Sequence, residues 1–237
     1  DHTSIEAFAA KARAVDARFG PEERARAAGA LTGGGDGAKE RLRAFVEGRG
    51  LMITTGQQPG LFGGPLYGLY KALTATALAE RLERELERPV IAVFWIASED
   101  HGWEEVRSSQ VLDMENRLQE VSLPPLTSAP ERPLHRIPAG AEVTEAVARF
   151  TSFLPETEFA PRWRDLLAEA YRPERTLGDA FEDLLGALTR TNGLFFVQDH
   201  EPSLKAASLP VLLRELAESG AEHIKPGTRV AAIGMKT

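Results

Sequence analysis

The sequence has no cysteine, which excludes disulfide bonds, thiolate nucleophiles and cysteine-ligated zinc sites from this chain of 237 residues. It also has no block of basic charge, because 28 Lys and Arg residues are interspersed among 35 Asp and Glu residues, for a net charge of -7. Proteins that bind nucleic acid through its phosphates show the opposite balance. We therefore expect no nucleic-acid partner.

Long apolar runs are missing as well. No uninterrupted apolar stretch approaches the roughly 18 residues of a membrane span, and no basic segment leads into an apolar region at the N-terminus. The chain is nevertheless 43% hydrophobic and 27% charged, which provides enough apolar material for a sizeable core. These features predict a soluble, cytoplasmic protein with no membrane partner.

Alternating strand and helix signals predict an α/β fold. Residues 51–55 and 194–197 are short apolar runs, and residues 89–97 are almost continuously apolar, as in a parallel strand covered on both faces. Apolar residues at helical spacing over 66–87 and 176–191 place a helix before each of the two later strands. A β-α-β unit crosses over right-handedly. We expect the three strands to be neighbours in one largely parallel sheet.

Further helices and a hairpin surround this predicted core. Glycines at residues 33–37 interrupt the N-terminal helices, and a proline-rich stretch over residues 124–138 follows a predicted hairpin at residues 111–123. Thr176 and Asp179 have the spacing of a capping box at the start of a helix. The additional predicted helices cover residues 4–19, 22–31, 39–47, 142–153, 161–171 and 202–219.

The first candidate site is the glycine-rich loop after the first strand, which holds Gly56, Gln57, Gln58 and Gly64. Glycines let backbone N–H groups approach a ligand, and the following helix N-terminus favours negative charge, so a phosphate or carboxylate is the expected ligand. The two carboxamides add donors and acceptors for a polar substrate. The alternative is a connection whose glycines only form turns.

The helix after this loop adds three candidate substrate-binding residues. Tyr67 and Tyr70 are three residues apart, and Tyr67 and Lys71 are four apart, so all three share one helical face beside the loop. The alternative for Lys71 is a solvated lysine without a chemical role.

The second candidate site follows the most apolar strand, where Glu99, Asp100 and His101 stand together. Carboxylates and an imidazole at a strand's carboxyl end can transfer protons, hold Mg²⁺ or bind an amine. We predict a catalytic role for all three, the alternative being a polar strand exit whose acids cap the next helix. No metal site is expected, because His135, His200 and His223 stand singly in unlike contexts.

A third, weaker site is the run Gln198, Asp199 and His200, which again follows a predicted strand. Its distance from the other two loops depends on the order of the strands in the sheet, which the sequence does not give.

Two motifs resemble the BshC family, the cysteine-adding enzymes of bacillithiol biosynthesis. The first is T-G-Q-Q-x-G-L-F-x-G-P-L-Y-x-x-Y-K over residues 55–71, and the second is V-F-W-I-A-x-E-D-H over residues 93–101. Shorter matches occur at residues 132–138, 171–181 and 193–205, so the likeness runs from about residue 50 to about residue 215.

The resemblance implies a Rossmann-like core similar to nucleotidylyltransferases and class I aminoacyl-tRNA synthetases. It implies a ligase that joins the carboxyl group of cysteine to the amine of glucosaminyl malate, the last step of bacillithiol biosynthesis. ATP would activate the carboxylate, although residues 56–64 lack the histidine pair of class I adenylating sites. Asp100 and His101 would hold or deprotonate the amine, and Gln57, Gln58 and Lys71 would bind carboxylates and hydroxyls.

The resemblance also divides the chain. Together with the sequence pattern, it predicts an N-terminal helical segment at residues 1–50, the first half of the Rossmann-like core at 51–108, a connecting insertion at 109–160, and helices with a further core strand, truncated, at 161–237. We expect a fragment that is inactive alone, with homodimers formed through a C-terminal coiled coil only by the full-length protein. Two alternatives stay open: a non-catalytic domain that binds a nucleotide or sugar acid, and another nucleotidyltransferase-like amide ligase.

Overall fold

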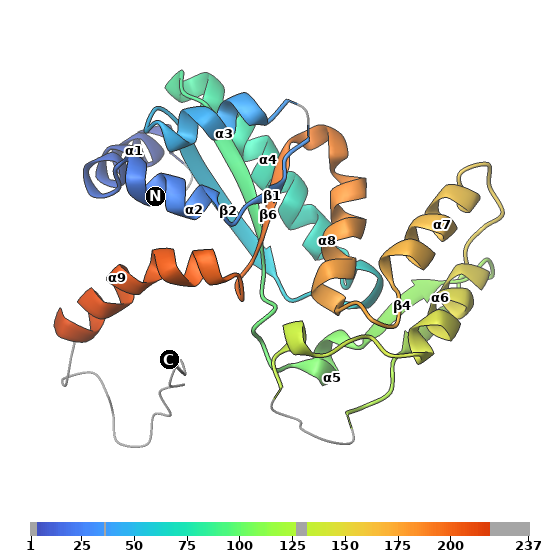
Figure 1. Cartoon of the computed structure of the whole chain (residues 1–237). Helices are drawn as coiled ribbons and strands as arrows, with labels where there is room; N and C mark the ends of the chain where they lie inside the picture. The colour runs from blue at the N-terminus through green and yellow to red at the C-terminus, as the bar shows by residue number, and fades with distance from the viewer. Residues whose placement is uncertain (1–3, 36, 127–131, 219–237) are drawn as a thin grey trace.

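The computed structural model describes residues 4–35, 37–126 and 132–218. Its centre is a four-stranded sheet in the order β1-β6-β3-β2, in which β2, β3 and β6 are parallel and β1 is antiparallel to β6 (Figure 1). This arrangement confirms the prediction of neighbouring parallel strands in an α/β fold. The strands are β1 (Thr32–Gly33), β2 (Leu51–Gln57), β3 (Val90–Ile96) and β6 (Leu194–Gln198).

The sheet is covered on both faces, which explains the apolar runs of its strands. Every residue of β6 is buried, and in β3 only Trp95 is exposed. A parallel sheet with helices on both sides needs apolar side chains in both directions along each strand. The near-continuous apolar character of residues 89–97 therefore indicated a central strand correctly.

One face of the sheet packs against α4 (Tyr67–Leu86) and α8 (Leu177–Leu188). The α4 helix approaches closely because its sheet-facing residues are small, and Phe94 of β3 meets Phe181 of α8 with ring centroids 5.8 Å apart. The predicted capping box is present at the start of α8, where Thr176 and Asp179 bond reciprocally. The buried alanines of α4 are Ala72, Ala75 and Ala79.

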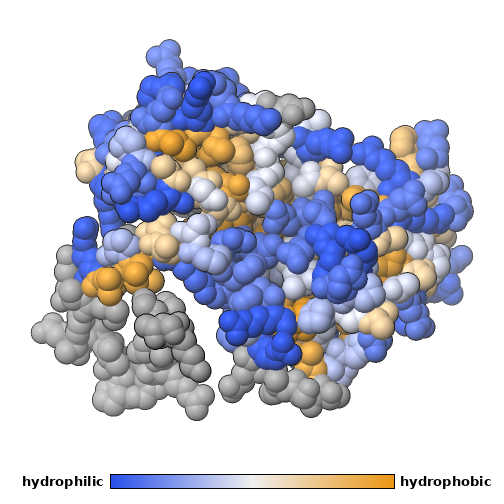
Figure 2. All heavy atoms as spheres, in the orientation of Figure 1, coloured by the Kyte–Doolittle hydropathy of each residue, from blue (hydrophilic) through white to orange (hydrophobic). Residues whose placement is uncertain are grey.

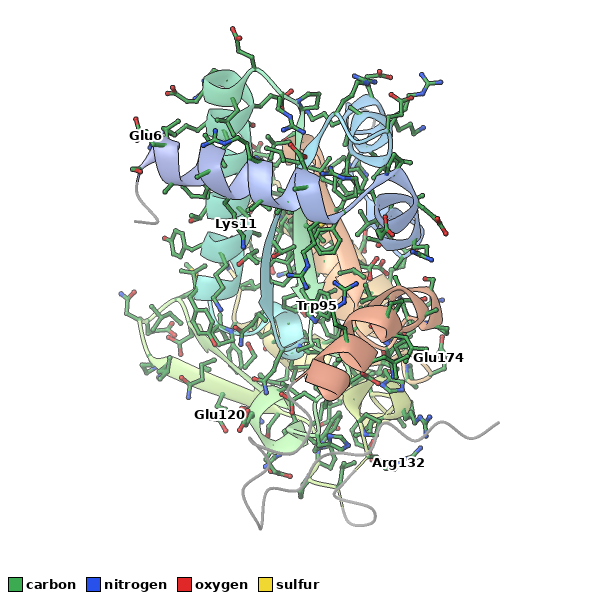
Figure 3. All side chains as sticks on the ribbon, turned by 90° about the vertical axis from the view of Figure 1, so that its left-hand side faces the viewer. Glu6, Lys11, Trp95, Glu120, Arg132 and Glu174 are labelled. Carbon is green, nitrogen blue, oxygen red and sulfur yellow. The ribbon has the colours of Figure 1, made fainter. Side chains whose placement is uncertain are left out.

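The other face packs against α2, α3 and α9, through Phe45, Ile91, Val93 and Phe195. The helix α1 contacts α4 and packs into the core of the first face. Trp95 is 37% exposed on this face (Figure 3). Hydrophobic side chains also gather on the surface of the outer part of α9 (Figure 2), where Leu212 and Leu213 are exposed. These helices are α1 (Ile5–Arg18), α2 (Pro21–Ala28), α3 (Lys39–Val46) and α9 (Pro202–Glu218).

A second hydrophobic core lies in the segment between β3 and α8. The loop after β2 contributes to it, because Phe62 packs on Phe150 and Tyr171 with ring centroids 4.4 and 4.9 Å away. The Tyr171 hydroxyl accepts a hydrogen bond from Gly63 N, and burial raises the pKa of this tyrosine. The elements here are α5 (Trp103–Val106), β4 (Ser108–Leu112), β5 (Leu118–Ser122), α6 (Glu142–Ser152) and α7 (Ala160–Ala170).

Several predicted boundaries need correction. The glycine cluster at residues 33–37 supplies part of β1, which pairs with β6, rather than only breaking a helix. The helix predicted over residues 176–191 ends at Leu188 and is followed by a separate 3₁₀ turn. The predicted end of the last helix at Gly220 lies outside the described residues. No helix in the described ranges combines the length and the apolar character needed to cross a membrane.

Candidate functional site

Gly56 lies within a strand and not in the loop that was predicted to bind a ligand. The strand β2 continues through Gly56 and Gln57, where the sequence pattern predicted a loop, and Gly56 pairs with Trp95 of β3. A Cβ atom at position 56 would lie 2.6 Å from the Trp95 carbonyl oxygen. Glycine is therefore required at position 56 by the close approach of two strands.

The remaining glycines of the loop form a closed turn. A Cβ atom on Gly60 would lie 2.5 Å from the Cα atom of Gly64, and Gly64 has a positive φ of 63°. The amides of Gly60, Gly63 and Gly64 donate to Gln58 O, Gly60 O and Leu61 O within the loop. These N–H groups are thus used internally, and the expected phosphate cradle has to rely on side chains instead.

Three side chains at the end of β2 and the start of α4 form what we call the Lys71 corner: Gln57, Tyr67 and Lys71. Lys71 Nζ donates to Gln57 Oε1 at 2.9 Å and to Gly56 O at 3.1 Å, and it lies 5.1 Å from the centre of the Tyr67 ring. Gln57 Nε2 donates to the Tyr67 hydroxyl at 2.9 Å. The corner is solvent-exposed and carries one positive charge.

Tyr70 lies apart from these contacts, although it shares the helical face. Its side chain is 61% exposed and lines a hollow of about 360 Å³ along β2, and Tyr67 and Lys71 line the same hollow. The structure therefore joins Tyr67 and Lys71 to Gln57 by direct contacts, and it places Tyr70 beside them in the same hollow.

Gln58 links the two motif loops. Its Nε2 donates to Asp100 Oδ2 at 2.6 Å and to Glu105 Oε2 at 2.9 Å, so one carboxamide from the loop after β2 bridges two carboxylates that follow β3. The other oxygen of Asp100 accepts from the backbone amides of His101 and Gly102 at 2.6 and 3.1 Å. This arrangement holds the Asp100 carboxylate in one orientation at the carboxyl end of the parallel strands, where open α/β sheets bind ligands.

The other two predicted catalytic residues are arranged differently. Glu99 forms an ion pair with Lys205 of α9, and its backbone amide donates to Asp199 Oδ1 at 2.8 Å. His101 is exposed, and its ring makes no hydrogen bond to any residue that the structure describes. Asp100 and His101 are therefore not joined through the imidazole, and the loop orients Asp100 more firmly than it orients His101.

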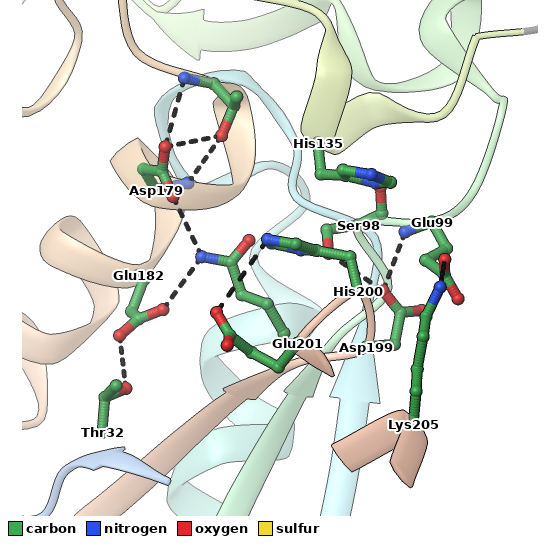
Figure 4. A network of polar contacts seen from close by, with 12 residues as sticks. Thr32, Ser98, Glu99, His135, Asp179, Glu182, Asp199, His200, Glu201 and Lys205 are labelled. Atoms are coloured by element: carbon green, nitrogen blue, oxygen red, sulfur yellow. Dashed lines mark hydrogen bonds and ion pairs between the residues drawn. The ribbon is translucent and has the colours of Figure 1, made fainter. Parts of the chain in front are cut away.

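A second polar group, which we call the Ser98 cluster, consists of Ser98, His135, Asp199 and His200 (Figure 4). Ser98 is fully buried, and its Oγ lies 2.9 Å from Asp199 Oδ1 and 2.7 Å from His200 Nδ1. The pairing of β3 with β6 places the weaker third candidate next to the second one. Asp199 and His200 thereby belong to the same strand-end region as Glu99.

His135 corrects the expectation that the histidines stand singly. Its ring stacks on the His200 ring with centroids 4.5 Å apart and planes 3° apart, and its backbone amide donates to Ser98 O at 2.8 Å. Burial is the main cause that lowers the pKa of His135, and His200 contributes in the same direction. Within the described ranges, no three His, Asp or Glu side chains have the arrangement that a metal ion needs. His223 lies outside the described residues.

Gln198 continues the polar network toward α8. Its Nε2 donates to Asp179 Oδ1 at 3.1 Å and to Glu182 Oε2 at 3.2 Å, and Glu182 accepts from Thr32 Oγ1 at 2.5 Å (Figure 4). Its Oε1 is the one buried side-chain polar atom without a hydrogen-bond partner in the described part of the chain. A Cβ atom on Gly178 would lie 2.6 Å from this oxygen.

Sequence reasoning missed Ser98, Glu105, His135 and the acidic pair on α8 as parts of the site. Ser98 directly precedes the predicted residues Glu99 to His101, and Glu105 follows them closely, so the signal for both was their position near Asp100. His135 had no local signal, because the path of the long segment between β3 and α8 places it there.

The fold and the site together define a Rossmann-like α/β domain with its polar residues at the carboxyl ends of the parallel strands. The family model described as "Bacillithiol biosynthesis BshC, N-terminal Rossmann-like domain" matches residues 30–231. The chain belongs to the BshC family.

Curated relatives agree with this assignment. The chain is 36% identical over 179 residues to "Putative cysteine ligase BshC" of Chlorobium phaeobacteroides (strain BS1), a match that covers 75% of this chain and 32% of that protein. It is 33% identical over 186 residues to the protein of the same name from Salinibacter ruber (strain DSM 13855 / M31), covering 77% and 34%. The chain thus spans about a third of the length of these relatives.

Proposed function

We propose that this chain forms part of the catalytic site of a cysteine ligase, which joins the carboxyl group of cysteine to the amine of glucosaminyl malate in the last step of bacillithiol biosynthesis. The names of its relatives support a cysteine ligase, and the description of the matching family supports a role in bacillithiol biosynthesis. The substrates and the position of the step are part of the proposal.

The observation that carries the proposal is the position of Gln58. Its carboxamide binds Asp100 and Glu105 simultaneously, so the two family motifs meet through one side chain. Two carboxylates and an amide, fixed by hydrogen bonds beyond the ends of parallel strands, are suited to orient a polar substrate. A loop that only connected a strand to a helix would not need this polar bridge.

The Lys71 corner suits the anionic part of the substrates. Lys71 carries the positive charge, and the Tyr67 hydroxyl, which already accepts from Gln57, has its own hydrogen available for a ligand oxygen. Hydrogen bonds from a charged donor to a carboxylate or phosphate are roughly twice as strong as neutral ones. We place the malate carboxylates here.

Amide formation also requires an activated carboxyl group. An amine that attacks a free carboxylate would have to expel oxide, whereas an acyl phosphate or acyl adenylate provides a better leaving group. We propose ATP as the co-substrate that supplies this activation. Cysteine carboxylate would take a phosphoryl or adenylyl group, and the amine nitrogen would then displace that group as its C–N bond forms.

Mass spectrometry of a reaction tests the proposal. The complete product of the gene that encodes this chain is incubated with cysteine, glucosaminyl malate and ATP, and we expect a product with the mass of cysteine plus glucosaminyl malate less one water. Omission of ATP, or replacement of cysteine by cysteamine, which lacks the carboxyl group, should abolish the product. A product that forms equally well without ATP would contradict the activation step.

The alternatives give different results in the same experiment. A non-catalytic domain would bind glucosaminyl malate or a nucleotide in calorimetry while no coupled product appears. Another amide ligase of the same fold would consume cysteine only when a different amine is supplied.

A further inference from the structure

The hydrogen bonds around Ser98 fix the tautomer of His200. An ionised Asp199 can only accept, so the Ser98 hydroxyl must donate its single hydrogen to Asp199 Oδ1, 2.9 Å away. The Ser98 oxygen then accepts from His200 Nδ1 at 2.7 Å, which requires a hydrogen on that nitrogen. In the neutral ring, His200 Nε2 is therefore an unprotonated acceptor.

The same reasoning applies to His135. Its Nδ1 lies 3.2 Å from the carbonyl oxygen of Ser98, and a carbonyl only accepts, so Nδ1 carries the hydrogen and Nε2 has the lone pair. Burial lowers the pKa of His135, which favours its neutral form. In their neutral forms, two stacked rings with centroids 4.5 Å apart thus both present unprotonated Nε2 atoms, and a positive charge on one ring disfavours a second charge on the other.

The surroundings of the two rings consist mainly of acceptors. Glu201 Oε1 lies 4.0 Å from His200 Nε2, and Asp199 is on the same turn, while Glu99 comes from the exit of β3 and is paired with Lys205 (Figure 4). Arg136 is the charged neighbour on the His135 side. The balance of charge around His200 Nε2 is therefore negative.

Gln198 provides an independent observation. The residue is 93% buried, and its Oε1 faces Gly178, close to Ser98, without a hydrogen-bond donor among the described residues. A buried acceptor that is left unpaired destabilises the folded protein. Gln198 is the last residue of β6 and directly precedes Asp199 and His200. An unsatisfied acceptor at the same strand end as unprotonated imidazole nitrogens and carboxylates points to a ligand that brings only donors and a positive charge.

We propose that the Ser98 cluster, with Gln198 and Glu201, binds the primary amine of the acceptor substrate, and that His200 Nε2 accepts its proton. In this step the ammonium R–NH₃⁺ gives one proton to the Nε2 lone pair. The products are the free amine R–NH₂, which keeps its nitrogen lone pair, and an imidazolium. The inference rests on the proposed function for the identity of the amine and assigns its binding to the ends of β3 and β6.

In this proposal, the two ends of the substrate bind to two different regions of the protein. The Lys71 corner offers donors and one positive charge, whereas the Ser98 cluster offers acceptors and negative charge. A substrate with carboxylates at one end and an ammonium at the other would therefore bind in one direction only.

Nuclear magnetic resonance of the 237-residue chain tests binding separately from catalysis. In long-range ¹H–¹⁵N spectra we expect the His200 ring to be protonated at Nδ1 and bare at Nε2. D-glucosamine should shift the Nε2 resonance of His200, and N-acetyl-D-glucosamine, which lacks the basic amine, should not. A protonated Nε2 in the neutral ring, or an equal response to both sugars, or to neither, would overturn the inference.

A pair of variants of the complete gene product tests the proton transfer. His200→Asn keeps an amide nitrogen at the place of Nδ1 and removes the base, so we expect kcat to fall about 100-fold or more, with loss of the acidic limb of the pH–rate profile. The melting temperature should stay near that of the wild type. His200→Gln lacks the donor to Ser98 and should also lower the melting temperature.

The outcomes separate the two proposals. If the wild-type protein forms no coupled product, the proposed function fails, while the sugar titration still decides whether the cluster binds an amine. If the wild type is active and His200→Asn retains its kcat and pH profile, the role of His200 as a base is wrong.

Discussion

The Lys71 corner and the Ser98 cluster are two polar groups at the same edge of one sheet, and they are built in opposite ways. The corner is exposed, and its lysine touches one side chain and one carbonyl of β2. The cluster is centred on a serine with no exposed surface, and it joins β3, β6 and the segment that carries His135. The exposed Lys71 corner can contact a ligand directly, whereas the buried Ser98 cluster also stabilises the contacts between the segments that it joins.

This difference predicts that substitutions in the two groups have different effects on substrate binding and on stability. Changes in the exposed corner should alter substrate binding and leave the free energy of unfolding nearly unchanged, because surface contacts contribute little to stability. Changes in the buried cluster should alter both, because each removed partner leaves a buried group unpaired.

The largest effect is expected for Asp199→Ala. The substitution leaves the Glu99 amide and the buried Ser98 hydroxyl without their acceptor, so we expect the free energy of unfolding to fall by about 2–3 kcal/mol. Urea denaturation measures this change. Asp199→Asn keeps one acceptor oxygen and should recover more than half of this loss. If Asp199→Ala changed the free energy of unfolding as little as a substitution in the exposed Lys71 corner, the predicted difference between the two groups would be wrong.

An intermediate effect is expected for Gln58→Ala. The half-buried Asp100 and the exposed Glu105 lose a shared donor, which should cost about 1–2 kcal/mol of unfolding free energy and lower kcat because Asp100 is no longer held in place. Stability comes from denaturation and activity from product formation. Gln57→Ala, the neighbouring carboxamide in the exposed corner, is the matched control and should change stability by less than about 0.5 kcal/mol.

Lys71→Ala is the corresponding substitution in the exposed Lys71 corner. Its side chain is exposed, so stability should change by less than about 0.5 kcal/mol. The lost charge–carboxylate contact should raise the KM for glucosaminyl malate about tenfold, which corresponds to roughly 1.4 kcal/mol of binding free energy. Steady-state kinetics measure the KM. An unchanged KM combined with a lower melting temperature would make Lys71 structural.

The smallest effect concerns pH. Because the pKa of His135 is lower in the folded protein than its usual value of 6.5, the unfolded chain binds more protons in the interval below that value. The stabilising effect of the neutral ring is complete above pH 6.5 and is lost as the pH falls. His135→Asn should therefore give a flatter stability curve between pH 7 and pH 5, measured by denaturation at several pH values, and an unchanged slope would contradict this origin.

The sequence predicted the sheet well because each of its strands carries its own local signal. Residues 89–97 and 194–197 are buried on both sides, and this requirement is visible in their composition. The polar runs after them marked the site for the same reason, because the apolar pattern stops where each strand leaves the sheet. β1 was missed because two residues in a glycine-rich segment carry no strand pattern.

Local sequence patterns could not predict which residues make up the site, because these residues come from distant parts of the chain. Ser98 and Asp199 are about a hundred positions apart along the chain, and only the pairing of β3 with β6 brings them together. Gly56 was interpreted as a ligand-facing glycine, but its missing side chain makes room for the Trp95 carbonyl. A local pattern cannot distinguish these two demands, because both require a residue without a Cβ atom.

The helix α8 belongs to both hydrophobic cores, since Phe181 and Leu185 face the sheet while Leu177, Ala180 and Leu184 face the second core. One inserted residue would turn every following side chain by about 100° and remove both sets from their positions together. Changes of chain length are therefore not tolerated in this helix. The turn between β4 and β5, at residues 113–117, is mostly exposed and is the place where the chain can be lengthened during evolution or engineering.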